Sequence, residues 1–165
     1  MSARTDLAKL RDLIEGVRIA MLTTVSEDSS LHSWPMVTQE MEPDGDLWFF
    51  TEADAEKVSQ VEHEQQVNLS YIHSGDRHIS ISGTAQFVRD AERGKRLWNP
   101  FVQAWFTGGP NDPNVGLLRV TVQGAEYWQS KSPRPIRLFQ YLSAVVAHQP
   151  PDVGDHDTLN LSGPR

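Results

Sequence analysis

The sequence predicts a mainly β fold, an antiparallel barrel or sandwich with helices at its periphery. Short segments rich in β-forming residues are joined by polar or glycine- and proline-containing turns, which favours hairpins and antiparallel pairing. Helical spacing of apolar residues is found at the start, middle and end of the chain, which does not fit alternating βαβ units. A chain of 165 residues is long enough for one domain with a sizeable core. Because the interior of a small barrel is filled by side chains, we expect any ligand at its rim or at a subunit interface.

The N-terminal segment predicts a helix followed by a β-hairpin. Leucines recur at helical spacing after a cap at Thr5 or Asp6, and Gly16 is placed to end the helix. Strands are expected over residues 17–25 and 31–39, with a polar turn between them.

The next elements centre on a short aromatic strand at residues 47–50. A helix over residues 53–64 should follow it, capped by Thr51 or Asp54. Earlier in the chain, Pro35 cannot donate to a strand ladder, so it predicts a sheet edge, a bulge or a break that faces a ligand.

The second half of the chain predicts further short strands and helices. Gly83 lies in mid-strand and predicts a bulge or a close backbone approach. Asp90 is placed to cap a helix. The remaining expected elements are strands 67–71 and 78–89, a helix from residue 91, a loop at 108–114, a hairpin of strands 117–122 and 125–129 around Gln123-Gly124, and a helix over 135–146. Residues 1–148 are expected to form the domain, and residues 149–165 a loosely ordered tail.

Composition narrows the class of protein. The formal net charge is −7, which argues against a nucleic-acid partner, because such binding needs a basic surface. The apolar runs are too short to span a membrane, and the N-terminus carries charges where a signal peptide would be apolar, so we expect a cytoplasmic protein. The chain has no cysteine, and its six histidines are scattered, so the sequence predicts no metal site.

Two stretches suggest binding, and each has a plainer interpretation. The strand that ends near residue 50 runs into a helix with Lys57 in its first turn, where backbone N–H groups and one ammonium could hold an anion. By itself this stretch favours a solvent-exposed lysine. The spacing of Trp98, Phe101 and Trp105 places three rings on one helical face. Core packing or a subunit interface explains this first, and stacking against a flat heterocycle is the alternative.

A series of motifs in one order resembles a known family. The motifs are Ala20-Met21-Leu22-Thr23-Thr24, His32-Ser33-Trp34-Pro35-Met36, Leu47-Trp48-Phe49-Phe50-Thr51 with Lys57-Val58, Val67-Asn68-Leu69-Ser70-Tyr71, Ser82-Gly83-Thr84-Ala85, Leu97-Trp98-Asn99-Pro100, Trp105-Phe106, Asp112-Pro113 and Ala125-Glu126-Tyr127-Trp128. Together they resemble the general-stress-protein branch of the pyridoxamine phosphate oxidase-like, FMN-binding split barrels. The resemblance implies a six-stranded antiparallel split β-barrel with peripheral helices. It also implies a homodimer that binds FMN in a cleft shared by the two protomers.

The resemblance also implies which residues hold the cofactor. They are Ser33, Trp34, Pro35, Met36, Val37, Phe49, Phe50, Thr51, Lys57, Trp98 and Trp105. Residues 33–37 would run along the isoalloxazine ring and residues 49–51 would line the ribityl chain. Lys57 would meet the phosphate, and the two tryptophans of the later segment would form a wall donated by the partner protomer.

One departure from the family pattern affects the expected function. Relatives commonly carry an arginine where this chain has Trp34, and an indole offers a single N–H where a guanidinium offers a fork. Ala55-Glu56 also replaces residues that often carry a hydroxyl or a positive charge. We expect an FMN-binding flavoprotein with a redox or flavin-storing stress role toward a small molecule, and no residue is identified as a catalytic acid or base. The alternatives are a non-enzymatic split-barrel dimer with weakened or lost flavin binding, or a protein that uses a deazaflavin or haem.

Overall fold

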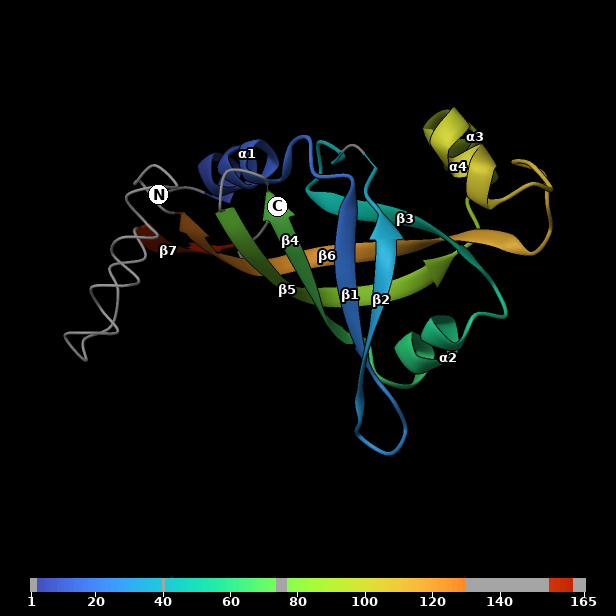
Figure 1. The fold of residues 1–165 in the computed structure, drawn as a ribbon, viewed down its shortest axis with the longest axis horizontal. Helices are drawn as coiled ribbons and strands as arrows, with labels where there is room; N and C mark the ends of the chain where they lie inside the picture. The colour runs from blue at the N-terminus through green and yellow to red at the C-terminus, as the bar shows by residue number, and fades with distance from the viewer. Residues whose placement is uncertain (1–2, 40, 74–76, 130–154, 162–165) are drawn as a thin grey trace, which may run out of the picture.

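The computed structural model describes residues 3–39, 41–73, 77–129 and 155–161, which form one antiparallel sheet surrounded by helices (Figure 1). The elements are α1 (Ala3–Ile14), β1 (Ile19–Val25), β2 (Leu31–Val37), β3 (Asp46–Glu52), α2 (Glu56–His63), β4 (Gln66–His73), β5 (Arg77–Val88), α3 (Ala91–Leu97), α4 (Pro100–Trp105), β6 (Val115–Gln129) and β7 (Asp155–Asn160). Every strand pair is antiparallel. The predicted mainly β, antiparallel architecture is therefore confirmed.

The sheet is a split barrel. In the described residues the hydrogen-bonded order is β2-β1-β4-β5-β6-β3, and the end strands β2 and β3 also contact each other. The sheet thus curls round while its ladder stays open between β2 and β3. These six strands match the expected barrel, and β7 is an addition that pairs with β6. Pro35 lies on the edge strand β2, opposite Met21, which confirms the predicted edge position.

Strand β3 is buried on both faces, which gives the molecule two apolar clusters. Successive side chains of a strand point to opposite faces. Leu47 and Phe49 enter the main core of the barrel, which α1 closes at one side. Trp48 and Phe50 enter a second cluster that packs against the α3–α4 segment. The candidate site lies next to this second cluster.

The predicted hairpin around Gln123-Gly124 is wrong, because both halves belong to the single strand β6. The partner strand β5 pairs Gly83 with Val122 and Ser82 with Gly124, so Gln123 is accommodated as a bulge. The prediction for Gly83 is confirmed on both counts, since a Cβ at this position would collide with the carbonyl oxygen of Thr121. A bulge in a long strand and a tight turn share the same sequence signal of a polar residue beside glycine.

The aromatic residues after position 97 do not share one helical face as predicted. Helix α3 begins at Ala91 and ends before Trp98. The side chain of the preceding Asp90 accepts from the Arg93 N–H, which confirms the predicted cap. Asn99 then caps the separate helix α4, with Pro100 at its first position. The chain turns between the helices because asparagine at the cap and proline after it favour a new helix start.

The two ends of the chain refine further predictions. Helix α1 begins at Ala3, ahead of the predicted cap, and Gly16 follows its end with a φ of 78°, which confirms the predicted stop. Residues 155–160 form β7, so the predicted loosely ordered tail is wrong for this part. Leu159 is the reason, because it is buried against the barrel. The predicted helix over 135–146 lies outside the described residues. No helix in the described ranges has the length and apolar character needed to cross a membrane.

Candidate functional site

A cavity of about 260 Å³ lies at the open seam of the barrel, between the edge strands β2 and β3. Helices α2 and α4 contribute further walls, and Ile19 of β1 adds to the lining. Its lining residues are Ile19, Pro35, Met36, Val37, Phe50, Thr51, Glu52, Ala55, Lys57, Val102, Trp105 and Phe106. Most of these side chains are apolar or aromatic, with polar groups at the α2 side. Such a lining suits a flat, largely apolar ligand that carries a few polar groups.

The cavity brings together most of the residues that the sequence singled out. Those that line it are Pro35, Met36, Val37, Phe50, Thr51, Lys57 and Trp105. They come from four separate elements, and the curl of the sheet places them side by side. Trp105 is 67% exposed, so its ring stands at the mouth of the cavity and is available to a ligand or to another chain.

Three predicted residues lie elsewhere. Ser33 is exposed on β2, where its hydroxyl shares a hydrogen bond of 2.8 Å with Thr23. Phe49 is fully buried in the main core, because it faces the opposite side of β3 from Phe50. Trp98 packs edge-on against Phe50, with 5.3 Å between ring centroids, and lines a neighbouring cavity of about 310 Å³.

Trp34 lies beside the cavity, and its indole N–H is already used. The N–H donates to the Thr24 hydroxyl at 2.9 Å, and that hydroxyl lies 2.5 Å from the Gln60 side-chain carbonyl, to which it donates. The ring is also flanked by His32, at 6.0 Å between centroids. The Lys57 ammonium lies over the indole face, 5.1 Å from the ring centroid. Trp34 thus contacts the cation of the site but offers no free N–H to a ligand.

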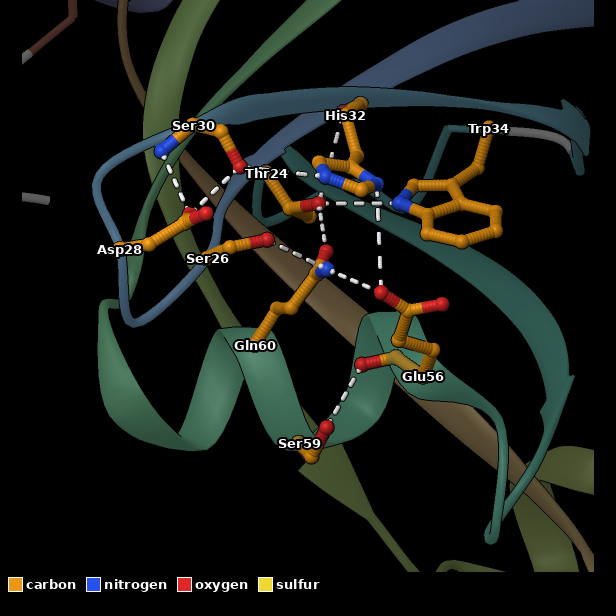
Figure 2. Close-up of polar contacts among 9 residues, drawn as sticks. All are labelled: Thr24, Ser26, Asp28, Ser30, His32, Trp34, Glu56, Ser59 and Gln60. Carbon is orange, nitrogen blue, oxygen red and sulfur yellow. Dashed lines mark hydrogen bonds and ion pairs between the residues drawn. The ribbon is translucent and has the colours of Figure 1, made fainter.

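A network of polar side chains holds this arrangement (Figure 2). Gln60 is a buried residue of α2 at the centre of this network, and its side chain reaches Thr24 and Ser26 of the β1–β2 hairpin. Its amide group donates to the Ser26 hydroxyl at 2.8 Å and to the Glu56 carboxylate at 2.9 Å. The Glu56 carboxylate lies 3.9 Å from the imidazole of His32. The network fixes α2, and with it Lys57, relative to the strand that carries Trp34.

The start of α2 differs from the prediction. The helix begins after Ala55, which provides no side-chain cap. Neither predicted cap serves this role. The Asp54 carboxylate instead accepts from the Asn114 amide at 3.0 Å, and the Thr51 hydroxyl donates to the neighbouring carbonyl. The chain makes an extra turn after β3, which moves the helix start beyond the reach of Thr51.

Lys57 is partly withdrawn from solvent. Burial lowers the pKa of its ammonium from the usual 10.5, and the negative charge of Glu52 partly opposes this shift. Among the described residues that line the cavity, Lys57 carries the only positive charge and Glu52 the only negative charge. The solvent-exposed lysine that this stretch favours by itself is therefore wrong, because the side chain forms part of the cavity wall, where the family resemblance places Lys57.

Comparison with known proteins places this geometry in a family. The sequence profile described as pyridoxamine 5′-phosphate oxidase like matches residues 5–152. The chain belongs to the pyridoxamine 5′-phosphate oxidase-like family. The resemblance stated from the motifs is thereby confirmed.

Relatives of known structure share the fold over most of their length. The general stress FMN/FAD binding protein of Xanthomonas citri is 32% identical, with a TM-score of 0.68 over 79% of this chain and 92% of that one. A protein of Jannaschia sp. CCS1 named for general stress protein 26 is 26% identical, with a TM-score of 0.69 over 94% and 99% of the two chains.

A relative found by sequence covers less of its own length. Protein bli-3 of Neurospora crassa is 34% identical over 67% of this chain. The match spans 58% of the length of bli-3.

Several residues that line the cavity are not among the site residues predicted from the sequence. They are Ile19, Glu52, Ala55, Val102 and Phe106. Glu52 and Phe106 directly follow predicted residues, so adjacency could have suggested them. Ile19 reaches the cavity only because it pairs with Val37 across β1 and β2, and that register was not part of the sequence argument.

Proposed function

We propose that this chain is an FMN-binding flavoprotein that holds the cofactor in the cavity between β2 and β3. The observation that supports this most is the convergence of β2, β3, α2 and α4 on one cavity with aromatic walls and a single ammonium. A flavin has a flat, polarisable ring system and a polar chain, and aromatic side chains stack well on such rings. The name of the Xanthomonas citri relative, a FMN/FAD binding protein, supports the same ligand class.

The residues present fit the ring system of a flavin better than the whole cofactor. At about 260 Å³, the cavity is below the roughly 300–1,000 Å³ usual for sites that enclose a ligand of drug size. Trp105 and Ile19 at its rim are 67% and 42% exposed. We infer that a second copy of the chain completes the cleft, so the proposed unit is a homodimer with the cofactor between protomers.

The proposed cellular role follows from the cofactor. A bound flavin supplies electron-transfer chemistry, while the protein contributes binding, orientation and exclusion of water. In this proposal Trp105 and Phe50 cover the ring, and Lys57 lies toward the polar chain. We propose that the substrate is a small molecule. The role would be a redox reaction or the storage of flavin under stress, and the protein would act in the cytoplasm.

A second candidate is a non-enzymatic split-barrel dimer that binds flavin weakly or not at all. The observation in its favour is Trp34, whose N–H is bound to Thr24 and whose ring lies under the Lys57 ammonium. In this arrangement the only described cation of the cavity already has an aromatic partner inside the protein.

The visible absorption spectrum of the purified full chain, recorded before and after FMN is added and removed by desalting, tests the proposal. Retained flavin bands are expected. A spectrum without flavin bands after loading would favour the second candidate. Haem or deazaflavin bands would show that the chain binds one of these cofactors in place of FMN.

A matched pair of variants then tests the location of the site. Trp105→Ala removes an exposed ring from the cavity, and Leu31→Ala removes an equally exposed side chain from β2, outside the lining. We expect weaker FMN retention in the first variant alone, because loss of one stacked base or ring typically costs about 1–3 kcal/mol. Equal retention in both variants would place the cofactor elsewhere. Light scattering should give twice the chain mass, and a monomer would contradict the shared cleft.

A further inference from the structure

The polar end of the cavity has no net charge in the described residues. Lys57 and Glu52 both line it, and their charges cancel. Burial lowers the Lys57 pKa, and only the nearby Glu52 charge opposes that effect. A site built for a doubly charged phosphate would be expected to carry excess positive charge and several N–H donors.

Trp34 occupies the place next to Lys57 and gives a phosphate nothing to bind. Its N–H donates to Thr24, which is fully buried, and the Thr24 hydroxyl is in turn committed to Gln60. The indole face is turned to the Lys57 ammonium at 5.1 Å. An aromatic face attracts a cation and repels an anion, because its quadrupole is negative at the face.

Glu56 precedes Lys57 in the chain and adds a further negative charge near the cavity, although its side chain is not part of the lining. It is the first residue of α2, where a carboxylate is favoured by the helix dipole. Its position is held by the hydrogen bond from Gln60. The negative charge of Glu56 therefore opposes a ligand anion at this end of the helix, although no side chain caps its backbone N–H groups.

We propose that this cavity selects a flavin by its ring system and ribityl chain and not by its terminal phosphate, so that riboflavin and FMN are both ligands of similar affinity. The inference rests on the proposed flavin-binding function and names the ligand class more closely. Trp34 is the residue that determines this selectivity, since an aromatic face without a free N–H lies beside the Lys57 ammonium.

Titration of the flavin-free full chain with riboflavin and with FMN tests the inference, with quenching of flavin fluorescence as the signal. The two dissociation constants should agree within about tenfold, because one charge-assisted phosphate contact is worth roughly that factor or more. A larger preference for FMN overturns the inference and leaves the flavin-binding function standing. Failure of both flavins to bind overturns the proposed function itself.

Variants at position 34 test whether Trp34 determines the selectivity between riboflavin and FMN. Trp34→Arg should create a preference for FMN of more than about tenfold, since a guanidinium binds phosphate through two N–H groups. Trp34→Phe removes the N–H without adding charge, and its ratio of affinities should match that of the unmodified chain. A folded Trp34→Arg variant, checked by circular dichroism, that shows no new preference overturns the role of Trp34. If this variant does not fold, the ratio for the unmodified chain and that for Trp34→Phe decide the inference.

Discussion

Gln60→Leu tests whether the polar network beneath the site holds α2 in place. The side chain of Gln60 is 5% exposed and forms hydrogen bonds with Thr24, Ser26 and Glu56 at 2.5, 2.8 and 2.9 Å. Leucine has a similar volume but can replace none of these bonds. The substitution therefore removes the polar link between α2 and the β1–β2 hairpin and changes the packing little.

The expected cost can be estimated from the three bonds. A buried neutral hydrogen bond contributes about 1 kcal/mol, and a buried donor left without a good partner costs about 1–3 kcal/mol. Thr24 is fully buried, and its remaining acceptor, the His32 carbonyl, lies 3.4 Å away. The Glu56 bond counts for less, because that side chain is 60% exposed. We expect the free energy of unfolding to fall by roughly 2–3 kcal/mol.

A double-mutant cycle with Thr24→Val separates the network from simple loss of contacts. Removing both partners leaves no stranded hydroxyl, so the double variant should be less destabilised than the sum of the single variants by about 1 kcal/mol or more. Gln86→Leu, at an exposed position of β5, is the matched control and should change stability by no more than about 0.5 kcal/mol.

Urea unfolding followed by tryptophan fluorescence measures these differences at one fixed protein concentration, because the proposed dimer makes stability depend on concentration. Additive effects of Gln60→Leu and Thr24→Val would show that the two side chains do not act together. An effect of Gln60→Leu no larger than that of the Gln86→Leu control would refute the network as a structural element.

Three further predictions concern stability. Gly83→Ala should lower the free energy of unfolding, measured in urea, by more than about 2 kcal/mol, because its Cβ would meet the β6 backbone. Gly94→Ala is the control, because its Cβ would meet open space in α3, and it should raise the free energy of unfolding by about 0.5–1 kcal/mol. Asp46→Ala should cost roughly 2–4 kcal/mol, because Asp46 is buried and binds Arg119 through two nitrogen atoms; a cost as small as that of a surface pair would contradict this. Because burial lowers the Lys57 pKa below 10.5, the folded chain binds this proton less tightly, so unmodified protein should gain stability relative to Lys57→Met as pH rises toward 10.5. Urea midpoints at neutral and alkaline pH check this, and a difference that does not change with pH would contradict it.

The fold was largely predictable because its signals are local. Alternating apolar residues and turn signals gave most strands, and Pro35, Gly83 and Gly16 each mark a backbone position that few other residues can occupy. The errors arose where one local signal has two structural outcomes. Gln123-Gly124 can be a turn or a bulge, and only pairing with a distant strand decides between them.

The site was predictable in part, and the reason lies in strand geometry. The sequence predicts the β3 segment as a ligand wall, and Phe50 and Thr51 do line the cavity, but Phe49 faces the core. Which of two adjacent aromatic residues faces outward depends on how the strand is covered on each side, and here both sides are covered. The contribution of Ile19 depends on the register of β1 with β2, which local sequence does not encode.

The network around Gln60 changes how Trp34 should be interpreted. From the sequence alone, Trp34 means the loss of a phosphate-binding group, since relatives commonly carry an arginine at this position. In the structure its N–H satisfies Thr24, whose hydroxyl satisfies Gln60, which in turn holds Glu56. Every polar group in this series has its partner within the chain, so no ligand anion is needed to satisfy them. A site arranged in this way can fold with the cavity empty and can bind a ring that brings little charge with it.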